Sequence, residues 1–180
     1  IPREPGTASL VGSVFHSWIE TYLRTLSAKS GEADVEDEPS GTTAALSDSD
    51  KRYLSSLQQA FGNSHFDSKF TVISLETPFT AVRDGVAIRG RIDAVLTAPD
   101  GKVWLIDWKT RRSLREEPSS FDLKYFQSQL SLYREAWEER ESAGPGGGEA
   151  TVVAAIVFVA PEGVKVMTLE EINRQIESRV

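Results

Sequence analysis

The sequence contains no cysteine, and no hydrophobic run in it approaches the length of a membrane span. Without cysteine, the chain can form neither disulfides nor a zinc or iron–sulfur centre held by thiolates. A transmembrane helix needs about 20 consecutive apolar residues, and the chain does not open with a signal peptide. We therefore expect a cytoplasmic protein that does not contact a membrane.

Methionine is nearly absent as well: the chain begins at Ile1, and its single methionine is Met167. We expect the sequence to be a fragment of a larger protein or a processed chain. Its 180 residues, 39% of them hydrophobic and 26% charged, suffice for one globular domain with its own core. Residues 1–180 are accordingly predicted to form a single domain.

The acidic residues are unevenly distributed, which matters for the choice of partner. The chain carries 27 acidic and 20 basic residues, a net charge of −7 that on its own argues against a nucleic-acid partner. Seven of the acids lie between residues 30 and 50, where there is no lysine or arginine. We predict that residues 28–46 form an acidic, mobile insertion. The rest of the chain is neutral and has seven basic residues near the motifs described below: Arg89, Arg91, Lys109, Arg111, Arg112, Arg115 and Lys124.

Hydrophobic periodicity predicts four helices and four strands. The helices are expected over residues 9–27, 47–61, 121–140 and 168–179. Ser9 and Ser47 are expected to cap the first two helices, and Gly62 to end the second. The first strand is expected to be interrupted near Pro78. The strands are expected over residues 69–82, 86–97, 102–109 and 151–160. The first three would form an antiparallel meander, and the fourth, which follows a helix, would pair in parallel with a neighbour.

The second and third predicted strands carry two carboxylates and a lysine. Between them, residues 98–101 (Ala-Pro-Asp-Gly) form a turn signal. If the hairpin is centred on Asp100, residues whose numbers sum to 200 face each other, so that Asp93 lies opposite Asp107. Side chains alternate along a strand, which places Asp107 and Lys109 on one face, shared with Asp93. A bulge at the turn would shift the register by one residue, so this pairing is a hypothesis.

Two carboxylates and an ammonium group at the end of an apolar strand are costly to desolvate unless a cation lies between the carboxylates. A divalent metal ion would meet that need, and hard oxygen ligands favour Mg²⁺ or Mn²⁺. Lys109 would then orient or deprotonate a water molecule beside the metal. The alternative is structural: Asp107 and Lys109 form a partly exposed pair at a strand end, and Asp93 is unrelated to them.

Four further residues outside this hairpin have two readings each. His16 lies at the edge of the apolar arc of the first predicted helix, where a lone histidine is usually structural. Gly12, one turn before it, indicates instead the close approach of a ligand or another backbone. Glu76 points either into the site or into solvent. Gln129 and Tyr133 share one helix face, where they either serve the site or are a surface amide and a core aromatic residue.

These residues fall into four short blocks along the predicted order of helix, three-strand meander, helix and strand. The blocks are Gly12-x-x-x-His16, Gly90 to Val95, Ile106 to Thr110, and Gln129 to Tyr133. Together they resemble the core of the PD-(D/E)XK nuclease superfamily, and more closely the RecB-type nuclease domain at the C-terminus of bacterial helicase–nucleases. The resemblance implies an α/β, restriction-endonuclease-like core: a mixed central sheet with an antiparallel meander, flanked by helices. One departure is Ile92, where the nominal superfamily motif has proline.

The resemblance also implies a role for each matching residue. Asp93 and Asp107 would be carboxylate ligands of Mg²⁺ or Mn²⁺, with His16 as a third ligand and the backbone carbonyl of Trp108 completing the shell. Lys109 would position and activate the attacking water. Relatives with an iron–sulfur cluster hold it through cysteines, which this chain lacks. The residues expected to brace the site or contact DNA are Gln129, Tyr133, Glu76 and Arg111.

The implied activity is that of a metal-dependent deoxyribonuclease that leaves 5′-phosphate and 3′-hydroxyl ends. We expect an exonuclease module of an ATP-dependent helicase–nuclease in double-strand break repair and recombination. Its partners would be single-stranded DNA or unwound ends, the helicase motor domains of the parent chain and a partner subunit. One alternative is a catalytically silent DNA-binding or scaffold domain, although such domains typically lack the hairpin Asp or Lys. Another is a stand-alone restriction or recombination endonuclease of the same superfamily.

Overall fold

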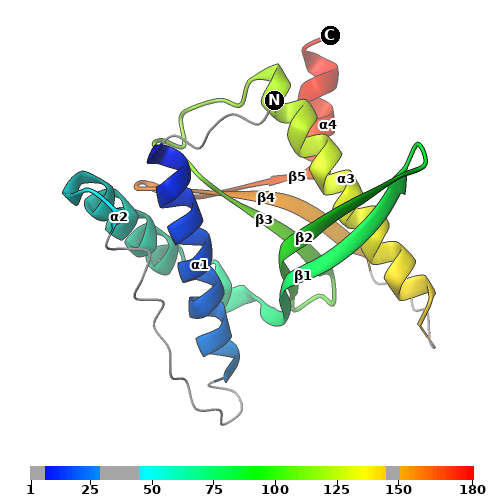
Figure 1. The fold of residues 1–180 in the computed structure, drawn as a ribbon, viewed down its shortest axis with the longest axis horizontal. Helices are drawn as coiled ribbons and strands as arrows, with labels where there is room; N and C mark the ends of the chain where they lie inside the picture. Colours follow the sequence, from blue (N-terminus) through cyan, green and yellow to red (C-terminus); the bar gives the residue numbers. More distant parts are fainter. Residues whose placement is uncertain (1–6, 29–44, 145–150) are drawn as a thin grey trace.

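The computed structural model describes residues 7–28, 45–144 and 151–180, and Figure 1 shows their arrangement. Most of the predicted acidic insertion, residues 28–46, lies outside the described residues. Its two ends differ from the expectation of a loop: Ala28 is the last residue of a helix, and Leu46 is buried in the core. Among the described residues, no helix is both long and apolar enough to cross a lipid bilayer.

A five-stranded mixed sheet forms the centre of the molecule, with its strands in sequence order (Figure 1). The strands are β1 (Thr71–Arg83), β2 (Val86–Thr97), β3 (Val103–Thr110), β4 (Val152–Ala160) and β5 (Gly163–Thr168). The first three form an antiparallel meander, β4 pairs in parallel with β3, and β5 pairs antiparallel with β4. The predicted meander and the parallel fourth strand are confirmed, whereas β5 was not predicted.

Two helices cover each face of the sheet, which creates two separate cores. α1 (Thr7–Ala28) and α2 (Asp48–Ser64) pack on one face, and α3 (Ser120–Ser142) and α4 (Leu169–Ser178) pack on the other. Along β3, Ile106 and Trp108 face the α1/α2 core, while Val103 and Leu105 face the α3/α4 core. Because side chains alternate along a strand, Asp107 and Lys109 lie on the same face as Val103 and Leu105. The apolar pattern of β3 therefore aims both residues toward α3.

Side-chain caps set the start of three of these helices. Ser47 accepts a hydrogen bond from the backbone N–H of Asp50 at the start of α2, as predicted. Capping boxes built on Ser119 and Thr168 begin α3 and α4. These caps fix where α3 starts, and hence which of its residues face β3.

Two predicted helix ends are wrong. α1 begins at Thr7, so Ser9 lies inside the helix and is not its N-cap. α2 continues through Gly62 to Ser64 and ends at His65, whose φ of 52° is left-handed. Glycine at position 62 costs helix stability but does not forbid the helical conformation, and the burial of Phe61 in the α1/α2 core outweighs that cost.

The β1–β2 pair bends where it passes β3. Pro78 does not interrupt β1, contrary to prediction: it pairs with Arg91, because β1 is an edge strand and tolerates the missing N–H. The register of the β1–β2 ladder shifts instead between Val72 and Ser74. Glu76, a non-glycine residue further along the strand, has a left-handed φ of 48°. On β2, Ala94 belongs to the α1/α2 core but Ile92 to the α3/α4 core. The strand thus changes face at the residue between them, Asp93.

The β2–β3 register is the predicted one, since the paired residues run from Ala94 with Ile106 to Thr97 with Val103. In each pair the residue numbers sum to 200. The ladder ends at Ala94 and Ile106, so Asp93 and Asp107 are not paired through their backbones. The two strands separate just before they reach the two carboxylates, which leaves both side chains at the end of the hairpin ladder.

Candidate active site

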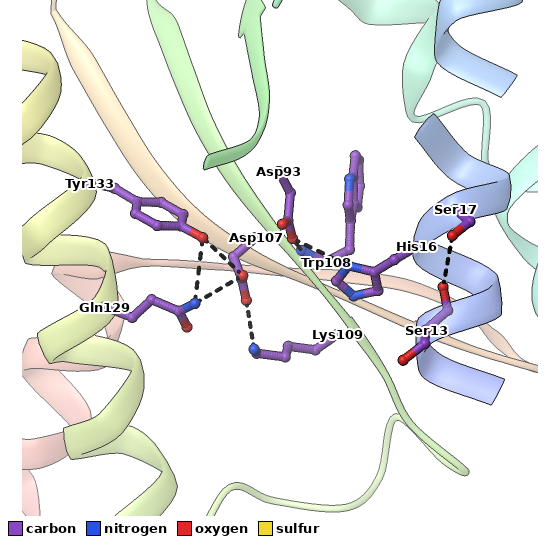
Figure 2. Close-up of polar contacts among 9 residues, drawn as sticks. All are labelled: Ser13, His16, Ser17, Asp93, Asp107, Trp108, Lys109, Gln129 and Tyr133. Carbon is purple, nitrogen blue, oxygen red and sulfur yellow. Dashed lines mark hydrogen bonds and ion pairs between the residues drawn. The ribbon is translucent and has the colours of Figure 1, made fainter. Parts of the chain in front are cut away.

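Most of the predicted site residues line one pocket of ≈ 510 Å³ beside the end of β3. His16 reaches it from α1, Glu76 from β1, Asp93 from β2, and Trp108 and Lys109 from β3. Figure 2 shows four of them, His16, Asp93, Trp108 and Lys109, between α1 on one side and α3 on the other. Four segments that are distant in the sequence therefore bring polar groups to the same point. The other residues in the wall are Gly12, Ser13, Ser17, Glu20 and Thr110.

Asp107 is the one charged residue that is buried among those described, with 3% of its surface exposed. Its Oδ1 atom accepts hydrogen bonds from Gln129 Nε2 at 3.1 Å and from the Tyr133 hydroxyl at 3.2 Å (Figure 2). Burial, followed by the charge of Asp107, raises the pKa of Tyr133, so the phenol keeps its proton and remains a donor. Two neutral donors from α3 thus hold this carboxylate in a fixed orientation.

Lys109 lies two residues after Asp107 on the same face of β3, as predicted. Its Nζ atom is 3.0 Å from Asp107 Oδ2, and 29% of the lysine side chain is exposed. Nζ also lies 5.9 Å from the ring centre of Tyr125 and 6.0 Å from that of Phe126, within the range of cation–π attraction. A buried carboxylate and two aromatic rings therefore position an ammonium group that still reaches the pocket.

Asp93 has fewer partners than Asp107. Its Oδ2 atom accepts the backbone N–H of Trp108 at 2.9 Å, in place of a continued backbone ladder. Burial, and next the nearby charge of Asp107, raises the pKa of Asp93 to about 8. With one backbone donor and a second carboxylate close by, the environment favours the protonated form of Asp93, and a cation in the pocket would compete with that proton.

His16 faces Asp93 across the pocket. Its Nδ1 atom is 3.7 Å from Asp93 Oδ2, which is too long for a hydrogen bond. Burial lowers the pKa of His16 below 6.5; the charge of Asp107 opposes this shift and that of Lys109 adds to it. The imidazole is therefore neutral at physiological pH, the form in which histidine binds metals.

Glu76 lines the pocket, which favours the interpretation that it belongs to the site. Burial, and then the neighbouring Glu20, raises the pKa of Glu76. The left-handed backbone at this residue is unfavourable for a side chain with a Cβ, and it occurs where the β1–β2 pair bends. Glu20 was not predicted as a site residue. The available signal was its position one helical turn after His16.

Two predicted residues lie at the edge of this arrangement. The Trp108 ring is buried in the α1/α2 core with 2% exposure, so its backbone is the part that reaches Asp93. The Arg111 guanidinium lies 5.1 Å from the ring centre of Phe158 and does not line the pocket. Of the two, Trp108 contacts a site carboxylate directly.

Phe79 packs against Tyr133 and Gly90 makes room for Phe79, and neither residue was predicted from the sequence to have this role. The rings of Phe79 and Tyr133 meet edge to face with their centres 5.6 Å apart. Gly90, on the neighbouring strand, makes room for Phe79: a Cβ atom there would lie 2.6 Å from the Phe79 ring. The absence of a side chain at Gly90 thus leaves room for the Phe79 ring to pack against Tyr133.

The donor set is chemically suited to a divalent cation. Asp107 Oδ2 is buried and has no hydrogen-bond partner among the described residues, although Lys109 neutralises it. The raised pKa of Asp93 favours a proton that a cation would displace, and the lowered pKa of His16 favours the neutral imidazole. In the described part of the chain, these side chains are not gathered into a ready metal cluster. They would have to turn from their present protein contacts toward a common point to hold Mg²⁺ or Mn²⁺.

The fold has relatives among solved structures. The "Putative exonuclease" from Eubacterium rectale aligns over 99% of this chain and 66% of its own, with 15% sequence identity and a TM-score of 0.62. At that identity the likeness concerns the fold alone, and the chain spans slightly less than two thirds of that protein. A protein named SSO0001 aligns over 99% of this chain and 76% of its own, at 19% identity, but its TM-score of 0.36 supports no argument. The comparison with curated proteins gives no match.

The family model of the PD-(D/E)XK nuclease superfamily matches residues 2–179, nearly the whole chain. The mixed five-stranded sheet flanked by helices is consistent with the restriction-endonuclease-like fold of this superfamily. Its nucleases hydrolyse phosphodiester bonds and generally use divalent metal ions, and a nuclease domain implies contact with DNA. By this match the chain belongs to the PD-(D/E)XK nuclease superfamily.

Proposed function

We propose that this chain is a metal-dependent DNA nuclease in which Asp93, Asp107 and His16 are the metal ligands and Lys109 acts on the attacking water. The main support is the ion pair between Asp107 Oδ2 and Lys109 Nζ, which lie 3.0 Å apart. Its carboxylate is buried, and its ammonium group reaches the pocket. A purely structural ion pair would not need a second buried carboxyl group beside it. The presence of Asp93 and a neutral His16 at the same pocket therefore favours the catalytic reading.

In the proposed reaction, a water oxygen forms a bond to phosphorus and the bond from phosphorus to the 3′ oxygen breaks. The 3′ oxygen takes up a proton, which gives 5′-phosphate and 3′-hydroxyl ends. A bound divalent cation would supply Lewis acidity and offset negative charge on the phosphate. Lys109 would hold the water in line and add a second positive charge. Gln129 and Tyr133 would keep Asp107 oriented, and the Trp108 carbonyl would be a further ligand.

We also propose the biological context in which this site acts, an ATP-dependent helicase–nuclease of double-strand break repair and recombination. The support is the resemblance of the four sequence blocks to RecB-type domains. In that setting the motor domains of a cytoplasmic parent protein, with a partner subunit, would deliver an unwound strand to the pocket. Glu76 and Arg111 are proposed to act at its margin, where they would meet the strand.

The test is cleavage of end-labelled DNA, single-stranded and duplex, with Mg²⁺, with Mn²⁺ and with EDTA. Three variants are compared with the wild type: Asp107→Ala, Lys109→Ala and Lys102→Ala. Lys102 is the matched control, because it is a lysine of the same hairpin that is 48% exposed and pairs with Asp100 at the turn. We expect metal-dependent cleavage that the first two variants lose and the control retains.

Two results would overturn the proposal. Cleavage that persists in both Asp107→Ala and Lys109→Ala would mean that the site lies elsewhere or that a contaminant is responsible. DNA binding without cleavage by the wild type would favour the silent scaffold domain. The helicase context is tested separately, by asking whether degradation of duplex DNA by the parent protein depends on ATP.

A further inference from the structure

The exposed aromatic residues of this protein are confined to one place. All eight Phe, four Trp and four Tyr residues of the chain fall within the described ranges, and only Phe121 and Tyr125 are exposed. Phe121 is 79% exposed and Tyr125 is 55% exposed. Since aromatic side chains normally bury most of their surface, two exposed rings together need a reason.

The two rings lie beside the candidate active site. Phe121 and Tyr125 are four residues apart on α3, so they share a helix face, and Gln129 follows one turn later. Gln129 donates to Asp107, and the Tyr125 ring lies 5.9 Å from Lys109 Nζ. Gln129, Tyr125 and Phe121 therefore form a row along α3. It leads from the buried Asp107 carboxylate, past the Lys109 ammonium group, to the surface.

The start of α3 is held firmly, so the exposure of these rings is not that of a frayed helix end. Ser119 and Asp122 form a complete capping box in the first turn. The preceding segment is tied down at two points: Glu162 accepts the backbone N–H of Leu114, and Arg179 donates to the carbonyl of Pro118. A fixed pair of rings loses little conformational entropy when a flat ligand stacks on it.

Charge near the rings is mixed, which limits purely electrostatic binding. Lys109 reaches the pocket, and Lys124, three residues after Phe121, is exposed. In the segment just before α3, the exposed bases Arg112 and Arg115 are matched by the exposed acids Glu116 and Glu117. With few unopposed cations, phosphate contacts alone would bind a polyanion weakly. Stacking, which does not depend on net charge, would then decide the affinity.

We propose that Tyr125 and Phe121 form a stacking site for unpaired bases of a single DNA strand whose neighbouring phosphate lies at Lys109. A base can stack on an exposed ring only when it is unpaired and splayed out, so this site would select single strands over duplex. The inference rests on the proposed nuclease function and deepens it, by naming the residues that hold the strand next to the site.

The experiment measures binding of a fluorescent oligothymidylate in EDTA, where cleavage does not interfere. The variants are Tyr125→Ala, Tyr125→Trp and Phe121→Ala, and the control is Val82→Ala, a residue that is 70% exposed on the β1–β2 hairpin. We expect Tyr125→Ala to weaken binding of the single strand about tenfold, while Tyr125→Trp retains it. Duplex binding should be the same in all of these proteins.

A second arm tests stacking itself. A series of oligonucleotides, each with one abasic position, should contain a member that the wild type binds as weakly as Tyr125→Ala binds the intact strand. The wild type and Tyr125→Ala should bind that oligonucleotide with the same affinity, because removing either the base or the ring abolishes the same stacking contact.

The proposal fails if Tyr125→Ala and the wild type show no difference on single strands, including the case in which neither binds. It also fails if single strands and duplex are affected equally, or if the substitutions alter only association with another protein domain. These outcomes are separable from the proposed function. Normal cleavage with no effect at Tyr125 defeats the stacking site alone, whereas stacking without cleavage by the wild type defeats the nuclease.

Discussion

The two sides of the site are built differently. On the α3 side, Gln129 and Tyr133 donate hydrogen bonds to Asp107, and Tyr125 lies near Lys109. On the α1 side, His16 comes no closer than 3.7 Å to Asp93 and makes no hydrogen bond to it. The α3 side holds its carboxylate in place without a ligand, although Asp107 Oδ2 and Gln129 Oε1 are buried without a hydrogen-bond partner among the described residues. The α1 side has donor atoms in place that a bound cation would draw together.

This difference follows from where each carboxylate sits. Asp107 lies on β3, the middle strand of the sheet, where it pairs with β4 and is almost fully buried, so its charge had to be neutralised within the fold. Asp93 is at the end of a ladder, where β2 has begun to bend away from β3, and keeping its proton is the alternative to finding a partner. We infer that the fold itself stabilises Asp107, whereas Asp93 and His16 would gain comparable partners only when a metal ion binds.

Among the substitutions that compare the two sides, the largest effect is expected from His16→Ala, which removes the imidazole of the α1 side. Activity at ordinary Mg²⁺ should fall about 100-fold and be partly restored at higher Mg²⁺ or Mn²⁺, because a lost ligand weakens metal affinity. Stability in EDTA should change by less than about 1 kcal/mol, since the imidazole makes no hydrogen bond to Asp93 and its contact of this kind is with the Trp108 backbone. A metal titration of the cleavage rate, with thermal unfolding in EDTA, measures both.

The matched control for His16→Ala is His65→Asn. His65 is the other histidine of the chain, it is exposed, and it ends α2 in a left-handed conformation that asparagine tolerates. This variant should cleave DNA like the wild type. If His16→Ala instead destabilised the metal-free protein strongly and metal did not restore its activity, the histidine would be a structural residue.

Gln129→Ala should show the opposite pattern, because it breaks the α3 side. Asp107 would lose one of two hydrogen bonds to a buried oxygen, which costs about 1–3 kcal/mol of unfolding free energy even in EDTA. Activity should fall about tenfold as the carboxylate loses its orientation, and added metal should not restore it. Urea unfolding provides the first number and cleavage kinetics the second.

Ser128→Ala is the comparison for this variant, since Ser128 is the exposed neighbour of Gln129 on the same helix. It should leave both quantities unchanged. Equal stability of Gln129→Ala and the wild type would mean that the Tyr133 hydroxyl and Lys109 suffice for Asp107, and the proposed difference between the two sides would lose its basis.

The features of this site that sequence could predict are those fixed by short-range chemistry. The turn at residues 98–101 set the β2–β3 register, and strand alternation then placed Asp107 beside Lys109. Helical spacing put Gln129 and Tyr133 on one face. Each of these inferences uses residues close together in the chain, where backbone geometry leaves few choices.

The features that could not be predicted depend on how distant segments pack. The bend of β1 and β2 at Glu76 and Asp93 arises because the outer hairpin leaves one core and joins the other. The fit of Phe79 over Gly90, which supports Tyr133, involves two strands and a helix. The end of the ladder before Asp93 likewise follows from the bend. No local pattern encodes these contacts.

A pH titration sharpens the comparison from the Asp93 side. The pKa of this carboxyl group is raised to about 8 in the folded, metal-free protein, against 3.8 as its ordinary value. Between those values the folded chain binds a proton that the unfolded chain has released, so this group makes stability fall as pH rises from about 4 to about 8. His16, whose pKa is lowered, acts in the opposite sense below about 6.5.

Asp93→Asn isolates this contribution from the others. Its amide oxygen can still accept the Trp108 N–H, but it does not titrate. The unfolding free energy of the variant minus that of the wild type, both in EDTA, should increase with pH by at most about 1.4 kcal/mol per unit across this window. A difference that stays flat with pH would show that Asp93 is ionised in the metal-free fold and already has a cationic partner.

The smallest effect is expected at Gly12, where the α1 side passes over the end of β3. The sequence raised the possibility that this glycine allows a ligand or backbone to come close. In the structure, a Cβ atom at Gly12 would meet Thr110 Oγ1 at 3.5 Å, an ordinary van der Waals distance. Gly12→Ala should therefore raise the unfolding free energy by about 0.5–1 kcal/mol through helix propensity and leave cleavage within about twofold.

Gly62→Ala is the control that gives the gain in helix propensity alone, since a Cβ atom there meets nothing within 4 Å. If both variants gained stability but only Gly12→Ala lost cleavage, the α1 side would be the surface against which the substrate or its metal must fit.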